Sequence, residues 1–538
     1  LYNGQKSAIF QPAKDYSSAS AIYMQTRKPL FKGEKKNNLN IGVKGGSFST
    51  INPSLLWEHR FNERISSSIS TEYMYTSGRY KFTYAKKDGY DTTAVRQNGD
   101  VRMLRLENAF FGKVPKGEWK AKAYLYNSER GYPGAAVREE PGKFRHQDRQ
   151  WDTNLFVQGS FQNYFKPWYS LLANGKYAYD YLHYLSDPRL DVTTMYVDNH
   201  YRQQEIYASA AHLFTIYPWW RMSLSNDFQW NALRADLIDF VYPTRNTILT
   251  SAATSFDFNR LMLQASLLYT HIDDNTRTKG ANAGTKNKYT PSVIATWQPL
   301  TKLPLNVRAF YKKVFRMPTL NDLYYTFIGN KDLKPEYTTQ YDVGITFSHT
   351  WNNHWLKSLD LQIDGYYNEV DDKIIAMPTS NQFRWTMINL GHVEIRGLDA
   401  AIRGEWGFGK VELSTLFNYT YQKAQDFTDP TSEWYGGQIP YIPWHGGSII
   451  LNGSYQTWSC NYSFIYTGER YEAVANIPEN YAQPWYTHDF SLSKTFQWGK
   501  TGIRVTAEIN NIFNQQYEVV QCYPMPGTSF KIKLNVML

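Results

Sequence analysis

Two pairs of adjacent carboxylates have the side-chain types and spacing that come nearest to a metal site. Asp273 with Asp274, and Asp371 with Asp372, could supply oxygen ligands to a calcium ion held by a loop. Neither pair has the DxDxDG spacing of a calcium loop, so solvated loop carboxylates are the preferred interpretation. The histidines stand singly, and the sequence contains no nucleophile motif, P-loop or HExxH motif. We therefore expect no catalysis, no metal site and no resident cofactor.

Aromatic side chains between the predicted strands are the second group with an evident chemical use. Their rigid, amphipathic rings can grip a bulky ligand through stacking and contact area. About half of them should instead belong to an outer aromatic girdle or to loop packing. The ligand contacts predicted from these segments are Tyr324, Tyr325, Phe327, Arg384, Trp385, Trp434 and Tyr435.

Four basic residues lie near the same segments, namely Arg316, Lys331, Lys334 and Arg384. They could draw an anionic ligand toward this region, or they could pair with neighbouring acids. Pairing is the favoured interpretation, with the candidate partners Asp322, Asp332 and Glu336. The net charge of +10 is spread without a basic run, so nucleic acid is not expected as a partner. A polar lumen and loops that face anionic lipopolysaccharide explain the charge better.

The amino-acid composition limits the fold classes that could hold these residues in place. Aromatics make up 17% of the 538 residues, yet mean hydropathy is only -0.55. A helical membrane protein would show apolar runs of about 20 residues, which the sequence lacks. A membrane β-barrel explains both values, because only every second residue faces lipid while aromatic girdles ring both interfaces.

Period-two alternation supports this interpretation from one end of the chain to the other. In the last segment, residues 529–538, Phe530, Ile532 and Leu534 alternate with Lys531 and Lys533. Similar alternation recurs in residues 503–509, 359–364, 305–309 and 65–72. Charged residues on the second face require water, as a polar lumen provides.

The connections between these segments alternate between short and long. The short ones fall at residues 61–64, 217–220, 258–260, 407–409 and 456–458, and the long ones at residues 81–100, 129–150, 187–200, 271–288, 318–336, 426–444 and 471–484. Outer-membrane barrels have short periplasmic turns and long extracellular loops. We predict an all-β, transmembrane antiparallel β-barrel of about 22 strands, with 20 and 24 as alternatives. A barrel of that width needs something to close its lumen.

The two cysteines, Cys460 and Cys522, fit no disulfide framework or metal spacing, and we expect two unpaired thiols near opposite ends of the barrel. The chain starts at Leu1 without an apolar export signal, which indicates a mature or truncated sequence.

Three widely separated segments resemble the TonB-dependent outer-membrane receptors. FRMPTLNDLYYTFIGNKDLKPEYTTQYDVGITF, residues 315–347, is similar to the family's FRAP, NPDL and LKPE box. NLGHVEIRGLDAAI, residues 389–402, resembles the strand after the next loop, and residues 510–538 resemble the carboxyl-terminal hairpin. The chain departs from the family pattern at Met317, Lys331 and the final Leu538, where Ala, Pro and Phe are commoner. The loop after the FRMP box is the favoured ligand site because the family's most characteristic residues flank it.

Residues 17–29, SSASAIYMQTRKP, are similar to the last strand of the family's plug domain. The resemblance therefore implies two domains: residues 1–37 as the carboxyl-terminal remnant of the plug with its linker, and residues 38–538 as the barrel. The rest of the plug and the TonB box would lie upstream. Residues 319–329 contain no histidine, which argues against the haem receptors of the family.

The resemblance implies active import of a bulky, scarce nutrient across the bacterial outer membrane, driven by TonB and its inner-membrane complex. A metal chelate is the favoured cargo, either a corrinoid such as cobalamin or an iron siderophore. A surface lipoprotein is a possible further partner, besides lipopolysaccharide. The alternatives are a passive porin-like channel, a surface receptor or adhesin barrel without uptake, and, more distantly, a soluble lectin.

Overall fold

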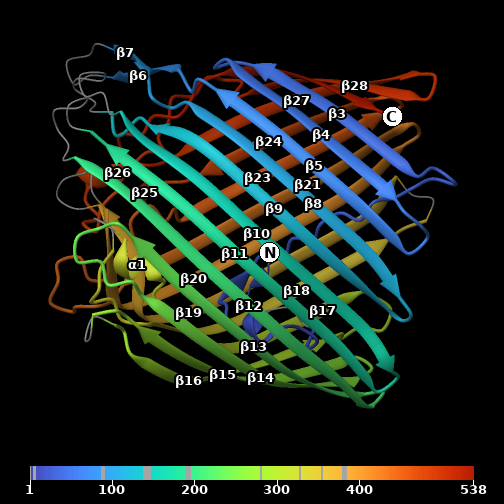
Figure 1. The fold of residues 1–538 in the computed structure, drawn as a ribbon, viewed down its shortest axis with the longest axis horizontal. Coiled ribbons are helices and arrows are strands. Elements are labelled where there is room, and N and C mark those ends of the chain that lie inside the picture. The colour runs from blue at the N-terminus through green and yellow to red at the C-terminus, as the bar shows by residue number, and fades with distance from the viewer. Residues whose placement is uncertain are drawn as a thin grey trace.

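The computed structural model describes residues 2–3, 8–85, 91–136, 147–187, 196–278, 282–325, 329–352, 355–378 and 385–538. Across these residues, 22 strands close into one antiparallel barrel, as predicted. Figure 1 shows the strongly tilted strands, with the long connections gathered at one end of the barrel and the short turns at the other. No helix of the described residues is long and apolar enough to cross a membrane.

The barrel wall follows the order of the chain, and its last strand pairs with its first. The first eleven strands are β3 (Asn37–Gly46), β4 (Thr50–Arg60), β5 (Ile65–Thr76), β8 (Val101–Val114), β9 (Gly117–Tyr132), β10 (Asp148–Lys166), β11 (Tyr169–Ser186), β12 (Val197–Tyr217), β13 (Trp220–Ala235), β14 (Thr244–Phe258) and β15 (Leu261–Asn275). The next eleven are β16 (Thr285–Trp297), β17 (Leu305–Arg316), β18 (Glu336–Thr350), β19 (Leu356–Pro378), β20 (Trp385–Phe408), β21 (Val411–Asp426), β23 (His445–Tyr455), β24 (Trp458–Thr467), β27 (Trp485–Trp498), β28 (Thr501–Asn510) and β29 (Ser529–Met537).

The smaller elements are not counted among these 22 wall strands. They are the pairs β1 (Tyr2–Asn3) with β2 (Ser20–Ala21), β6 (Tyr80–Ala85) with β7 (Asp91–Arg96) and β25 (Arg470–Tyr471) with β26 (Tyr481–Ala482), the short β22 (Gly437–Gln438), the helix α1 (Leu320–Tyr324) and the 3-10 turns η1 (Ala13–Tyr16) and η2 (Pro478–Asn480). The two cysteines are free thiols, Cys460 on β24 beside a short turn and Cys522 in the connection after β28, as predicted.

The closing strand β29 shows how alternation fixes the two faces of the wall. Phe530 and Ile532 are 58% and 62% exposed on the outside, where lipid would cover them. Lys531 points the other way and pairs in register with Glu508 on β28, whose carboxylate lies 3.1 Å from the Lys44 ammonium of β3. Charges are therefore paired on the inside, and apolar groups form the outer surface.

Short turns connect the strands at one end of the barrel. Several consist of two residues, including residues 115–116, 259–260, 409–410, 456–457 and 499–500. Lys116, Asn259, Gln456 and the glycine at 409 adopt positive φ values of 54° to 65°, which suits tight hairpins between twisted strands. The turns at residues 259–260, 409–410 and 456–457 coincide with predicted short connections, and those at residues 115–116 and 499–500 add to them.

Some predicted long connections are partly strand. Residues 271–275 belong to β15 and residues 285–288 to β16, so the connection between them covers only residues 276–284. The expectation of solvated loop carboxylates at this place is wrong for Asp274, which is 3% exposed and forms an ion pair with Arg245 of β14. Asp273 of β15 accepts a hydrogen bond from Thr285 of β16, on the other side of the strand. Local sequence could not show these partners, because register brings them together.

The amino-terminal segment runs inside the barrel, as the dark blue trace in Figure 1 shows. Asp227 on the inner face of β13 accepts hydrogen bonds from the backbone amides of Ala13 (3.0 Å) and Lys14 (2.8 Å). Ile9, Ala13 and Tyr16 form a buried cluster with the inward residues Leu249, Ala253 and Leu268. The segment is therefore attached to the wall by both polar and apolar contacts.

Farther along, the same segment contacts another part of the wall. Arg27 forms an ion pair with Glu58 of β4, and Lys28 forms one with Glu118 at the start of β9, beside a short turn. The first wall strand then begins at Asn37, one residue before the boundary expected from the sequence.

Candidate functional site

The helix α1 organises the connection between β17 and β18. Thr319 caps its amino terminus: the hydroxyl accepts from the Asp322 amide (3.1 Å), and the Asp322 carboxylate accepts from the Thr319 amide (2.8 Å). This reciprocal capping box satisfies two backbone donors that a helix of one turn leaves open. The Asp322 carboxylate therefore caps the helix instead of pairing with a basic side chain.

Apolar packing holds α1 against the barrel wall. Leu320, Leu323 and Tyr324 are at most 7% exposed and contact residues from three strands. These partners are Tyr201 of β12, Leu233 and Ala235 of β13 and Ile374 of β19, with Val241 from the connection after β13 and Leu333 from the connection before β18. Burial of side chains of this size stabilises the connection by roughly 1.5–3 kcal/mol each. The connection is therefore a folded part of the barrel mouth.

A buried ion pair lies beneath the helix. Arg245 contacts both carboxylate oxygens of Asp274 at 2.6 and 2.7 Å, and it also donates to the carbonyl oxygen of Pro318 at 2.6 Å. The guanidinium therefore joins β14, β15 and Pro318, the residue before the helix cap. An unpaired charge here would be costly, because both side chains are almost fully buried.

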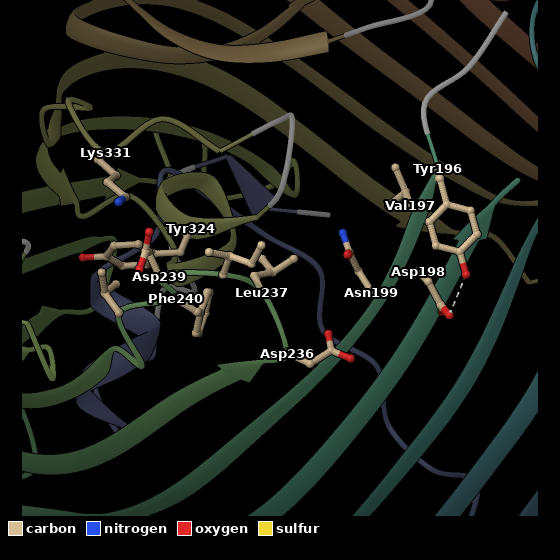
Figure 2. A pocket seen from close by; sticks show the side chains of 12 residues that line it. Tyr196, Val197, Asp198, Asn199, Asp236, Leu237, Asp239, Phe240, Tyr324 and Lys331 are labelled. Carbon is tan, nitrogen blue, oxygen red and sulfur yellow. Dashed lines mark hydrogen bonds between the residues drawn. The ribbon is translucent and has the colours of Figure 1, made fainter. Parts of the chain in front are cut away.

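A cavity of about 530 Å³ opens beside α1 at this end of the barrel. Figure 2 shows that its lining side chains come from the start of β12, the connection between β13 and β14, and α1. The lining residues are Tyr196, Val197, Asp198, Asn199, Asp236, Leu237, Ile238, Asp239, Phe240, Val241, Tyr324 and Lys331. This volume lies within the usual range for small-molecule sites, about 300–1,000 Å³.

The lining is acidic and aromatic. Asp198, Asp236 and Asp239 supply three carboxylates against the single ammonium of Lys331. Tyr196 donates a hydrogen bond to Asp198 at 3.3 Å, drawn as a dashed line in Figure 2. Burial, and then the nearby Asp274 carboxylate, raise the pKa of Tyr324, so its phenol stays neutral at physiological pH. Such a site favours ligands that present hydrogen-bond donors or positive charge over polyanions.

The predicted aromatic contacts divide between two connections. Tyr324 lines the cavity, and Tyr325 stacks on Tyr201 with ring centroids 4.3 Å apart. Burial raises the pKa of Tyr325 as well. These two residues therefore shape the cavity wall and its immediate support.

Three of the remaining predicted contacts, Trp385, Trp434 and Tyr435, are not among the residues that line this cavity. Trp385 lies 6.2 Å from the Tyr441 ring, between centroids, at the start of β20. Trp434 and Tyr435, in the connection between β21 and β23, are 37% and 47% exposed. Phe327 and Arg384 lie outside the described residues.

Two of the four basic residues pair with acids, as the sequence suggested. Arg316 forms an ion pair with Glu336 at 2.9 Å. Lys334 lies 3.8 Å from Asp372, a partner that was not among those expected. Lys331 lines the cavity instead. Arg316 and Lys334 are thus engaged with acids at the mouth.

Sequence reasoning missed the acidic half of the cavity. Asp236 and Asp239 belong to an eight-residue connection, residues 236–243, that was not recognised as long. The run DLIDF within it, residues 236–240, offered a signal, because two acids break the alternation between two clear strands. Asp198 lay in a predicted loop but starts β12.

Comparison with known proteins places this architecture in a family. The family model described as "TonB dependent receptor-like, beta-barrel" matches residues 49–512, which is most of the chain. Vitamin B12 transporter BtuB of Photobacterium profundum is 28% identical over 244 residues, or 44% of this chain and 36% of that protein. The same transporter of Vibrio vulnificus is 31% identical over 207 residues, or 38% and 29%. The matched part spans about a third of the length of these relatives.

Solved structures share the fold at low sequence identity. Copper transporter OprC superposes with a TM-score of 0.74 and 14% identity, covering 100% of this chain and 85% of that one. The FrpB iron transporter from Neisseria meningitidis gives 0.72 and 11%, covering 94% and 83%. The family match and the 22-strand barrel agree with each other and with the resemblance of the three segments. The chain belongs to the TonB-dependent receptor family, the barrels of which lie in the outer membrane of bacteria.

Proposed function

We propose that this protein imports a bulky metal chelate across the outer membrane, using energy delivered through TonB, and that a corrinoid is the preferred cargo. The family match and the two vitamin B12 transporters among its relatives support the proposal. The protein would act as a receptor and transporter, without catalysis of its own and without nucleic acid as a partner. Lipopolysaccharide and a surface lipoprotein are its proposed additional contacts.

The attachment of residues 9–18 to the inner wall is the observation that carries the proposal. A barrel of about 22 strands is wide enough to need a plug. Residues 1–37 would be the end of that plug and its linker, and residues 38–538 the barrel. Asp227 holds this segment through two backbone amides, a contact that a pull on the plug could break and re-form. A passive channel has no need of such an attachment.

The chemistry of the cavity supports a corrinoid over an anionic siderophore complex. Three carboxylates and one lysine line it, together with the rings of Tyr196, Phe240 and Tyr324. The peripheral amide groups of a corrinoid can donate hydrogen bonds to carboxylates, and its large ring system can rest on aromatic faces. A highly anionic ferric complex would be repelled by the same acids. Trp434 and Tyr435 would add contacts from the neighbouring connection.

Uptake measurements in a strain that lacks this gene, and in the strain complemented with the full-length gene, test the proposal. We expect the complemented strain alone to accumulate labelled cobalamin at nanomolar supply, because a high-affinity receptor is needed at that concentration. Ferric citrate, a ferric catecholate and a ferric hydroxamate are the comparison cargoes.

Asp236→Asn, Asp239→Asn and the double variant test the cavity in the same strain. Cobalamin uptake should fall at least tenfold in the double variant, because one hydrogen bond to a charged group contributes about 1.5–3 kcal/mol. Ser493→Ala is the control, because Ser493 lies on the inner face of β27, away from the cavity, and its hydroxyl contacts the Thr506 hydroxyl of the neighbouring strand at 2.9 Å. Uptake of a ferric complex in place of cobalamin would overturn the corrinoid assignment, and uptake of none of these cargoes would overturn chelate import.

A further inference from the structure

Two imidazoles and a carboxylate converge on the outer face of the barrel, at the end with the long connections. His183 on β11 pairs in register with His200 on β12, and Asp198 lies two residues before His200 on the same face. The His183 Nε2 atom is 2.7 Å from Asp198 Oδ1. One potential ligand atom from each of the three residues lies within 4.8 Å of the others.

The position of this cluster leaves it accessible to water. Tyr177 and Ile206 lie on the same outer faces of β11 and β12, 40% and 44% exposed where lipid would cover them. The cluster lies farther along both strands, three residues before the end of β11 and at the start of β12. The Trp151 ring stacks on His183, with centroids 4.6 Å apart, as an interfacial aromatic would. The histidines are therefore at the rim, beyond the apolar band.

Neighbouring groups orient the rings as metal sites usually require. The Tyr181 hydroxyl lies 2.7 Å from His200 Nδ1, a contact that fixes this ring through its other nitrogen. His200 Nε2 then lies 3.7 Å from Asp198 Oδ1 and 3.8 Å from Asp236 Oδ2. Asp236 also accepts a hydrogen bond from the His200 amide at 2.8 Å, so its carboxylate is held at the same place. Two carboxylates thus face one imidazole nitrogen.

We propose that His183, Asp198 and His200, with Asp236 as a fourth ligand, form a binding site for a divalent transition-metal ion such as Zn²⁺ or Cu²⁺. Two imidazoles and carboxylates suit these ions, whereas Ca²⁺ and Mg²⁺ prefer oxygen ligands alone. The two imidazole rings are stacked, with their centroids 4.0 Å apart and an angle of 11° between their planes. Binding would turn them toward one another and bring the ligand atoms to about 3.4 Å separation, as tetrahedral bonds of about 2.1 Å require.

This site would join three wall elements and reach the cavity. His183 belongs to β11, Asp198 and His200 to β12, and Asp236 follows β13 directly. Asp198 and Asp236 also line the cavity beside α1. A bound ion would therefore fix two of the cavity carboxylates and withdraw part of their negative charge. The site does not depend on the identity of the imported ligand.

Metal titration of the full-length protein in detergent, after removal of metals with a chelator, tests the proposal. Zn²⁺ is added in competition with a chromophoric chelator, and Ca²⁺ is added in a parallel titration. We expect one equivalent of Zn²⁺ to bind, with an affinity at least 100-fold above that for Ca²⁺. His183→Ala and His200→Ala should each reduce Zn²⁺ affinity at least 100-fold, and Tyr181→Phe should reduce it about tenfold.

His271→Ala is the matched control, because His271 is a half-buried strand histidine with no second histidine beside it, and its Nδ1 lies 2.8 Å from the side-chain amide oxygen of Asn287. It should bind Zn²⁺ as the unchanged protein does. Heat-modifiable migration on gels verifies that each variant forms the barrel. Unchanged Zn²⁺ binding in a folded His183→Ala, His200→Ala double variant would overturn the proposal, as would the absence of stoichiometric binding by the unchanged protein. The cluster would then be a hydrogen-bonded group only.

Discussion

Different interactions stabilise the two ends of the barrel. At the short-turn end, several hairpins are connected by two residues, and left-handed positions such as Asn259 and Gly409 satisfy the geometry locally. At the opposite end, α1 folds only because Leu320 and Leu323 pack on residues from β12, β13 and β19. The structure of the short-turn end is therefore determined by residues close together in sequence. The structure of the other end depends on contacts between residues far apart in sequence. Ligand specificity can reside only in the end that is free to vary.

Removing the packing under α1 should have the largest effect. Leu323 is 2% exposed, and Leu323→Ala should cost about 2–5 kcal/mol at this connection. We expect the region of residues 317–335 to become sensitive to limited proteolysis and ligand affinity to fall, while the barrel remains heat-modifiable. Leu303→Ala, at the short-turn end and 48% exposed there, is the control. Unchanged protease resistance in Leu323→Ala would contradict the account of a folded mouth.

The wall between the two ends provides the next test. Ile532 faces outward on β29, so Ile532→Asp should cost up to about 2–4 kcal/mol near the middle of the membrane and reduce the yield of folded barrel. The neighbouring Lys531→Asn, on the inner face, should assemble with nearly normal yield. Refolding into lipid vesicles, followed by gel shift, measures both variants. Equal yields would show that the assignment of the two faces is wrong.

The wall and the short turns were also the parts that the sequence predicted best. Alternation in residues 529–536 placed Ile532 and Lys531 on opposite faces, because a strand has a period of two. The succession of short and long connections then indicated about 22 strands. The acidic side of the cavity could not be predicted in this way. Asp198 and Asp236 lie 38 positions apart, and only the register of β12 against β13 brings them together.

Exposed aromatics at the long-connection end should matter for ligand rather than for folding. Trp434 is 37% exposed, and we expect Trp434→Ala to weaken cobalamin binding about tenfold, the loss of about 1.4 kcal/mol typical of an aromatic anchor. Equilibrium binding to the full-length protein measures the change. Trp498→Ala removes a more exposed tryptophan, 79%, from the short-turn end and should leave affinity unchanged. Equal losses in both variants would remove the functional distinction between the ends.

A substitution in a short turn should have the smallest effect on the stability of the barrel. Gly409 has φ of 64°, and no atom lies within 4 Å of the position that an added Cβ would take. Gly409→Ala should therefore cost only the strain of the left-handed backbone, about 1 kcal/mol. The urea midpoint of unfolding in vesicles measures it, with Gly284→Ala as a matched change at the other end, since Gly284 is also left-handed and open. A loss as large as that of Ile532→Asp would mean that the turn has tertiary contacts.

The energy dependence of transport tests the central proposal most directly. The measurement is the initial rate of labelled cobalamin uptake by cells that carry the full-length protein, with and without a functional TonB. If import is energised through TonB, uptake should fall to background without TonB, while binding of cobalamin at the cell surface persists. Uptake at the same rate in both strains would contradict the proposal and would identify the barrel as a passive channel.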